Sequence, residues 1–174
     1  METLKEKIMK QEKQDRYVAS ECLKKLLNKG SNLSIIPTPL TDAVDLNCSV
    51  VNLNGKYVPF NVEIKERNKT DWQLSKYPQA ELKVEKYERM RKATPAGVKL
   101  LYMVLLNNQK CLLFDLDKLD WNKVTETIWY IKKTQMKEDS PVVPTPTYLI
   151  PYDLAIATCD CWEFVEYYKN NLAN

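Results

Sequence analysis

Apolar and polar residues alternate along two neighbouring stretches in the first half of the chain, residues 45–50 and 58–65. The apolar positions are Leu46, Cys48 and Val50 in the first stretch and Val58, Phe60, Val62 and Ile64 in the second. An alternation with period two is typical of strands with one apolar face. Between them, Asn54-Gly55 favours a tight turn because both residues tolerate positive φ. The sequence therefore predicts a β-hairpin.

The phase of this hairpin brings acidic residues together. Both apolar sets fall on even numbers. If both even-numbered faces pack on the core, the numbers of two directly paired residues must sum to an even value. A three-residue loop at 53–55 then sets Asp45 opposite Glu63. Lys65 lies on the same non-core face. Opposed β-carbons are about 5 Å apart, so two carboxylates could share one metal ion. Asp42, the rival acid, is out of phase by one residue, and Pro59 could mark a bulge that changes the phase.

A simpler interpretation of these polar residues stays open. Polar residues that alternate along a strand usually face solvent, and an aspartate near a strand start is often part of a turn. The spacing Glu-x-Lys is also common, and Glu81-Leu82-Lys83 repeats it in this chain. The hairpin alone is therefore compatible with a metal site and with a solvated strand face.

The rest of the chain follows from periodicity and from its prolines and glycines. We expect helices over about Thr3–Lys29 (with Gly30 as its C-cap), Pro78–Lys92, Asp120–Met136 and Cys161–Asn170. We expect strands over about Asn32–Ile36, Lys99–Leu106 and Cys111–Leu116, the last two buried on both faces because their apolar runs are nearly continuous. Asn68–Tyr77 is interpreted as a polar loop, and Ser140–Pro151 as an extended proline-rich strap. The predicted order is αβββαβ with further elements, an α/β fold with a mixed central sheet flanked by helices.

Length and composition limit the organisation and the chemistry. With 174 residues we expect a single domain over 1–174, with a core at about 14–116 and a C-terminal helical and proline-rich extension at 117–174. Histidine is absent and the three glycines are isolated. These two facts exclude histidine-based catalysis, histidine-ligated metals and glycine-rich phosphate loops. Catalysis would have to use carboxylates, lysines, tyrosines or cysteines.

Charge and cysteine usage bear on partners and compartment. The net charge of +3, from 26 basic and 23 acidic residues, is compatible with a nucleic-acid partner without requiring one. We expect no membrane association, because the longest apolar stretch, Leu100–Leu106, is too short to span a bilayer. Of the five cysteines, Cys22, Cys48 and Cys111 are expected to be small core hydrophobes, and Cys159 and Cys161 to be reduced thiols at the start of the last helix in a cytoplasmic protein. Cys159-Asp160-Cys161 could suggest metal or redox chemistry, but we expect no metal there, because a structural zinc site needs four ligands and Cys-x-Cys is not the usual spacing.

Asp45 and the strand Glu63-Ile64-Lys65, in this order of elements, resemble the PD-(D/E)xK nuclease superfamily, which has the restriction-endonuclease-like fold. The resemblance covers roughly residues 14–116. Holliday-junction-resolvase-like members also carry a glutamate in the first helix, as this chain does at Glu21. One departure is Val44, where many members have a proline before the first acid.

The resemblance implies roles for these residues. Asp45 and Glu63 would bind Mg²⁺ or Mn²⁺, hard cations that prefer oxygen ligands, with the Ile64 carbonyl as a third ligand. Lys65 would orient or deprotonate a water or stabilise negative charge. Glu21 would hold a second metal or support the first, although an ordinary solvated helix glutamate is an equal alternative.

The second predicted helix would contribute to substrate binding. Gln79, Lys83 and Lys86 could share one face and contact phosphates, although the interleaved glutamates also fit a solvated face. The leading hypothesis is a metal-dependent DNA endonuclease or DNA-processing phosphodiesterase, which could act as a homodimer to cut both strands. The alternatives are a catalytically inactive nucleic-acid-binding or assembly subunit on the same fold, and a structural α/β protein.

Overall fold

The computed structural model describes residues 3–27, 32–39, 42–52, 54–132 and 140–173. Its helices are α1 (Leu4–Leu27), α2 (Asp71–Lys76), α3 (Val84–Ala93) and α4 (Trp162–Asn171). Its strands are β1 (Asn32–Pro37), β2 (Leu46–Val51), β3 (Tyr57–Arg67), β4 (Gln79–Lys83), β5 (Lys99–Leu106), β6 (Lys110–Asp115), β7 (Thr125–Lys132), β8 (Val142–Pro151) and β9 (Ala157–Asp160). Short 3₁₀ turns lie at Trp121–Lys123 and Tyr152–Leu154. Gly30, the expected C-cap of the first helix, lies outside the described residues.

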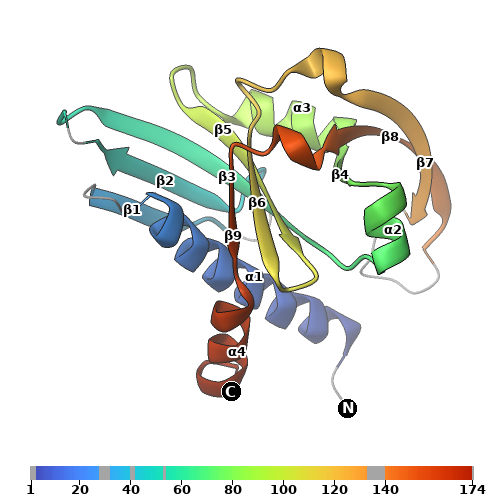
Figure 1. The fold of residues 1–174 in the computed structure, drawn as a ribbon, viewed down its shortest axis with the longest axis horizontal. Helices are drawn as coiled ribbons and strands as arrows, with labels where there is room; N and C mark the ends of the chain where they lie inside the picture. The colour runs from blue at the N-terminus through green and yellow to red at the C-terminus, as the bar shows by residue number, and fades with distance from the viewer. Residues whose placement is uncertain (1–2, 28–31, 40–41, 53, 133–139, 174) are drawn as a thin grey trace.

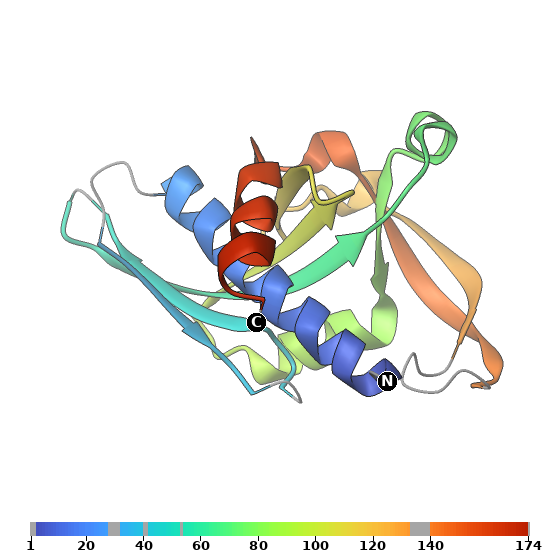
Figure 2. The same cartoon turned by 90° about the horizontal axis from the view of Figure 1, so that it is seen from below.

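A curled mixed sheet forms the centre of the molecule, with strand order β1-β2-β3-β5-β6-β9 (Figure 1). β3 and β5 are parallel, and the other neighbours in this sheet are antiparallel. α1 and α4 cover one face of it (Figure 2), and the core on that face includes Val18 and Leu23 of α1 and Val165 of α4. The predicted fold class, a mixed sheet flanked by helices, is confirmed.

The opposite face of the central sheet is covered by α3 and by a second sheet of order β4-β8-β7 (Figure 1). Met90 of α3, Leu82 of β4 and Ile150 of β8 pack there against Tyr102 and Phe114. β5 and β6 are therefore buried on both faces, as their continuous apolar runs predict.

The hairpin of β2 and β3 has the predicted phase. Leu46 pairs with Val62 and Cys48 with Phe60, so the even-numbered residues face the core under α1. Pro59 pairs with Ser49 without interrupting the register, so it does not mark a bulge. Gly55 has φ +73°, which fits the turn chemistry of the Asn-Gly pair.

Three predictions of secondary structure differ from the observed elements: the helix over Pro78–Lys92 forms only in part, the helix over Asp120–Met136 does not form in its described part, and the polar loop over Asn68–Tyr77 contains α2. Residues 79–83 form β4 and pair antiparallel with β8, so the helix expected over Pro78–Lys92 begins only at Val84. The helix expected over Asp120–Met136 is replaced, in its described part, by a 3₁₀ turn and by β7. In both places pairing with β8, which lies more than sixty residues after β4 but directly follows β7, replaces the local helical pattern.

The C-terminal segment contributes strands to both sheets, which the sequence analysis did not predict. The strap expected over Ser140–Pro151 is extended, but it forms β8, the middle strand of the second sheet. β9 adds to the edge of the central sheet by pairing with β6. The described part of the extension at 117–174 thus contains three strands, and only α4 is a predicted helix that forms there. Among the described helices, none is both long and apolar enough to cross a membrane.

Candidate functional site

Asp45 and Glu63 come together where β2 begins. The ladder pairs Leu46 with Val62, so the next position along each strand sets Asp45 beside Glu63. The chain leaves the regular ladder here: the Asp45 N–H donates to the Val62 carbonyl at 2.9 Å, and Asp45 Oδ2 accepts from the Ile64 N–H at 2.8 Å. The backbone of β3 therefore fixes the Asp45 carboxylate beside the acid-x-Lys strand.

The pair opens into a cavity of about 710 Å³ between α1, β3, β4 and α3. Its walls carry both acidic and basic side chains, with few apolar ones. The charged lining residues are Glu12, Asp15, Arg16, Asp42, Asp45, Glu63, Lys65, Glu66, Arg67, Glu81, Lys83, Glu85, Lys86 and Arg89. Asp42 lines the cavity as well, but Asp45 occupies the position beside Glu63 that the strand phase predicts.

Glu63 is buried and only partly compensated. Its Oε1 forms an ion pair with Lys86 Nζ at 2.8 Å, while its buried Oε2 has no hydrogen-bond partner among the described residues. Burial, and then the neighbouring Asp45 charge, raise the pKa of Glu63 to about 8, and Lys86 limits the rise. A buried acceptor without a donor is costly in a folded protein. The Glu63–Asp45 pair thus has an unmet capacity to bind a cation.

Lys65 lies next along the same strand, two residues after Glu63, and also lines the cavity. Burial lowers the pKa of Lys65, and the nearby cation Arg67 lowers it further. A lysine with a lowered pKa can exchange a proton at a pH closer to neutral than an exposed lysine can.

The first helix presents Asp15 and Arg16 to the site. Arg16 Nη2 pairs with Asp45 Oδ1 at 3.1 Å, and Arg16 Nη1 donates to the Thr38 carbonyl. Asp15 accepts from Gln11 Nε2 at 2.8 Å, and burial raises the pKa of Asp15 to about 7.

The sequence analysis missed Asp15 and named Glu21 instead. Glu21 is not among the lining residues of the cavity, and it pairs with Lys24 at 2.6 Å. Glu21 follows Asp15 by six residues, so at about 100° per residue its side chain points about 120° away from that of Asp15 around the helix axis. The signal was present in the sequence, since Ile8, Gln11, Glu12 and Asp15 have the spacing of one helix face.

The three expected substrate-binding residues do not share a helix face. Gln79 lies on β4 and is not among the cavity-lining residues, and its carbonyl accepts from Lys69 Nζ at 2.6 Å. Lys83 precedes the first turn of α3 and Lys86 lies within it, and both line the cavity. Arg89, one turn after Lys86, adds a third cation to that wall.

Comparison with known proteins finds similarity to a solved structure but to no family model or curated protein. No family model matches the chain, and no curated protein matches it. Among solved structures, the Holliday junction resolvase Hjc of Archaeoglobus fulgidus is similar over 83% of this chain and 96% of that one, with a TM-score of 0.42 and 13% identity. A likeness this low carries no argument about function.

Proposed function

We propose that the chain is a metal-dependent DNA endonuclease or DNA-processing phosphodiesterase. The observation that carries the proposal is the Asp45–Glu63 pair at the cavity, with the buried Glu63 Oε2 lacking a partner among the described residues and Lys65 beside it. Paired carboxylates that meet in a polar cavity suit hard divalent cations such as Mg²⁺ and Mn²⁺.

The residues present fit such a cation. Each carboxylate oxygen offers two lone pairs, so Asp45 can bind a metal while it keeps its hydrogen bonds to Arg16 and to the Ile64 N–H. Glu63 Oε2 can bind while Oε1 keeps its ion pair with Lys86. We propose Asp45, Glu63 and the Ile64 carbonyl as ligands, with Asp15 as an additional support from α1. A bound divalent cation would acidify a water and stabilise charge on a phosphate.

The remaining groups have roles around that reaction. Lys65 would hold the attacking water or take its proton, as its lowered pKa allows. Arg16 fixes the Asp45 carboxylate in place. Lys83, Lys86 and Arg89 form a basic wall where a phosphate backbone can lie. Cutting both strands of a duplex with one site per chain would call for a homodimer.

One observation favours the alternative, a catalytically inactive nucleic-acid-binding or assembly subunit. Lys86 already pairs with Glu63, so its ammonium could take the place of a metal ion in the site. In that protein Glu63 and Lys86 would stabilise the fold, and the cavity would bind nucleic acid without cutting it.

Cleavage tests decide between the two functions. The purified chain is incubated with duplex, single-stranded and four-way-junction DNA in Mg²⁺ or Mn²⁺, with EDTA as control. The nuclease proposal expects products that disappear in EDTA and in Glu63→Gln, but persist in Glu88→Gln, an exposed residue of α3 outside the cavity lining. Binding without cleavage in every metal would establish the alternative, and cleavage that survives EDTA would contradict a metal-dependent site.

A further inference from the structure

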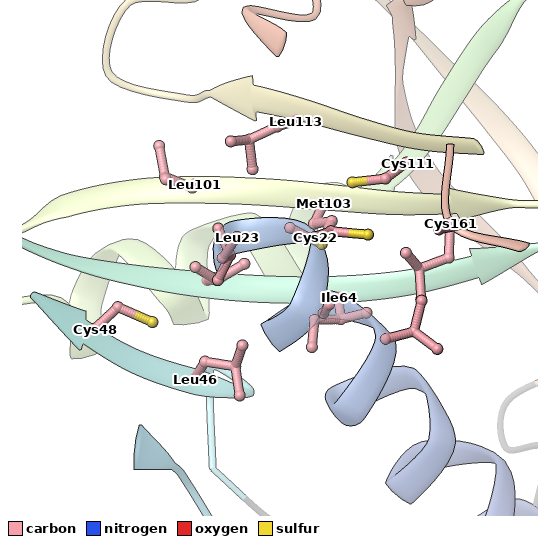
Figure 3. Close-up of a cluster of buried hydrophobic side chains, with 14 of the residues drawn as sticks. Cys22, Leu23, Leu46, Cys48, Ile64, Leu101, Met103, Cys111, Leu113 and Cys161 are labelled. Carbon is pink, nitrogen blue, oxygen red and sulfur yellow. The ribbon is translucent and has the colours of Figure 1, made fainter. Parts of the chain in front are cut away.

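Three of the five cysteines, Cys22, Cys111 and Cys159, form a cluster in the core, outside the cavity that holds the carboxylate pair, and Cys161 lies beside Cys22 in the same core. The sulfur atoms of Cys22, Cys111 and Cys159 all lie within 4.8 Å of one another. They come from α1, β6 and β9, which are separated along the chain by dozens of residues. Figure 3 shows Cys22 of α1 below Cys111 of β6, with Cys161 beside them.

The strand pairing explains why these sulfurs meet. Cys111 and Cys159 are direct partners in the antiparallel pairing of β6 with β9. Cys161 follows two residues later, and its backbone N–H donates to the Gln109 carbonyl at 2.8 Å, which extends the same pairing. Residues two apart on a strand point to one face, so Cys159 and Cys161 both reach the α1 side, where Cys22 lies.

We propose that Cys22, Cys111, Cys159 and Cys161 bind one thiophilic divalent cation, Zn²⁺, which ties α1, β6, β9 and α4 together. The Cys159-Asp160-Cys161 pair supplies two ligands, and the fold supplies the two that the local sequence lacks. Nothing in this site takes part in the hydrolysis proposed above.

The distances suit a single ion. Zn–S bonds of about 2.3 Å in a tetrahedron place the sulfurs roughly 3.8 Å apart. The sulfurs of Cys22, Cys111 and Cys159, already within 4.8 Å of one another, reach this separation with small side-chain shifts. The Cys161 sulfur lies outside that group and would move toward it from its contact with Cys22. An iron–sulfur cluster would hold its cysteine sulfurs farther apart, which makes one ion the better fit.

The surroundings offset the negative charge of bound thiolates. Cys161 immediately precedes α4, and the N-terminus of a helix favours a thiolate. Lys25 holds its ammonium 5.6 Å from the centroid of the Phe164 ring, in the first turn of α4. A positive charge therefore lies close to the Cys159–Cys161 end of the cluster.

Cys48 provides a matched control. It is a free buried cysteine in the same hydrophobic core, but it is not part of the sulfur cluster (Figure 3). Replacing it removes the same atoms from the same core without touching the proposed site.

The test measures the zinc content of the full chain, purified under reducing conditions without chelator. We expect about one ion per chain in the native protein and in Cys48→Ala, and a loss of most of it in Cys159→Ala, which changes the half-exposed member of the cluster. Circular dichroism checks that each variant folds.

A second measurement keeps the test decisive if Cys159→Ala fails to fold. The native chain is stripped with a chelator and titrated with Co²⁺, which gives visible absorption bands when thiolates hold it tetrahedrally. Such bands, displaced by one equivalent of Zn²⁺, support the proposal. Native protein without zinc and without these bands would overturn it, as would iron in place of zinc, a Cys111–Cys159 disulfide, or equal loss of metal in Cys48→Ala.

Discussion

Metal binding at the carboxylate pair should depend steeply on pH, because Glu63 must lose a proton before it can bind. Burial and the charge of Asp45 raise the pKa of Glu63 to about 8, so in metal-free protein at pH 6 this carboxyl is mostly protonated. Carboxylates bind metals only in the deprotonated form. We therefore expect the affinity for Mn²⁺ to rise from pH 6 to pH 8 and to level off above about pH 8.

The size of the effect follows from one proton. Release of one proton per ion changes the affinity by up to about tenfold per pH unit, so roughly a hundredfold is expected between pH 6 and pH 8. Asp15, whose pKa is raised to about 7, would steepen the dependence below pH 7 if it also supports the ion.

The same shift affects the free energy of unfolding of the metal-free protein. Between about pH 4.5 and 8 the folded chain keeps a proton on Glu63 that the unfolded chain has lost, so stability falls as the pH rises. At pH 7 this costs about 3 kcal/mol, at roughly 1.4 kcal/mol per pH unit above the ordinary pKa. Glu63→Gln should remove this part of the pH dependence, whereas Glu88→Gln should keep it.

Calorimetric titration with Mn²⁺ at pH 6, 7 and 8 measures the affinity. Repeating it in buffers of different ionisation enthalpy counts the protons released. Urea unfolding of the native chain and the two variants measures stability over the same range. An affinity that stays constant from pH 6 to 8, with no proton released, would refute this reasoning.

Three further variants probe the site. Lys65→Ala should slow cleavage by roughly 10²–10⁴-fold if the lysine moves a proton, while urea unfolding stays near the native value; undiminished cleavage would remove Lys65 from the reaction. Arg16→Ala should lower the free energy of unfolding by about 1–3 kcal/mol, because the half-buried Asp45 loses its ion pair; a change within about 0.5 kcal/mol would show that the pair contributes little. Lys83→Ala combined with Lys86→Ala should weaken DNA binding in filter assays, and the log–log salt slope should fall by about one unit for each phosphate that the protein no longer neutralises; an unchanged slope would place the DNA elsewhere.

Features that depend on strand geometry could be predicted from the sequence. The period of two fixes which residues of a strand share a face, so the even-numbered phase of the hairpin predicted the pairing of Leu46 with Val62. Asp45 and Glu63 followed from that pairing. The two apolar strands at Lys99–Leu106 and Lys110–Asp115 were also recognisable, because burial on both faces leaves continuous apolar runs.

Other features were not predicted from the sequence. Pro78 suggested a helix start, yet Gln79–Lys83 alternates polar and buried apolar residues and pairs with β8 more than sixty residues away. In β7, Ile128 and Ile131 have helical spacing, but Thr125–Lys132 is also rich in β-branched and aromatic residues and pairs with β8, the next strand. The sulfur cluster depends on α1, β6 and β9 meeting in space, which no local pattern records.

The most direct test of the carboxylate site is a crystal of the chain soaked in Mn²⁺, with anomalous scattering recorded near the manganese edge. The proposed function predicts a peak between the carboxylates of Asp45 and Glu63, beside the Ile64 carbonyl, and no such peak in Glu63→Gln. A map with no manganese between Asp45 and Glu63 would contradict the metal site.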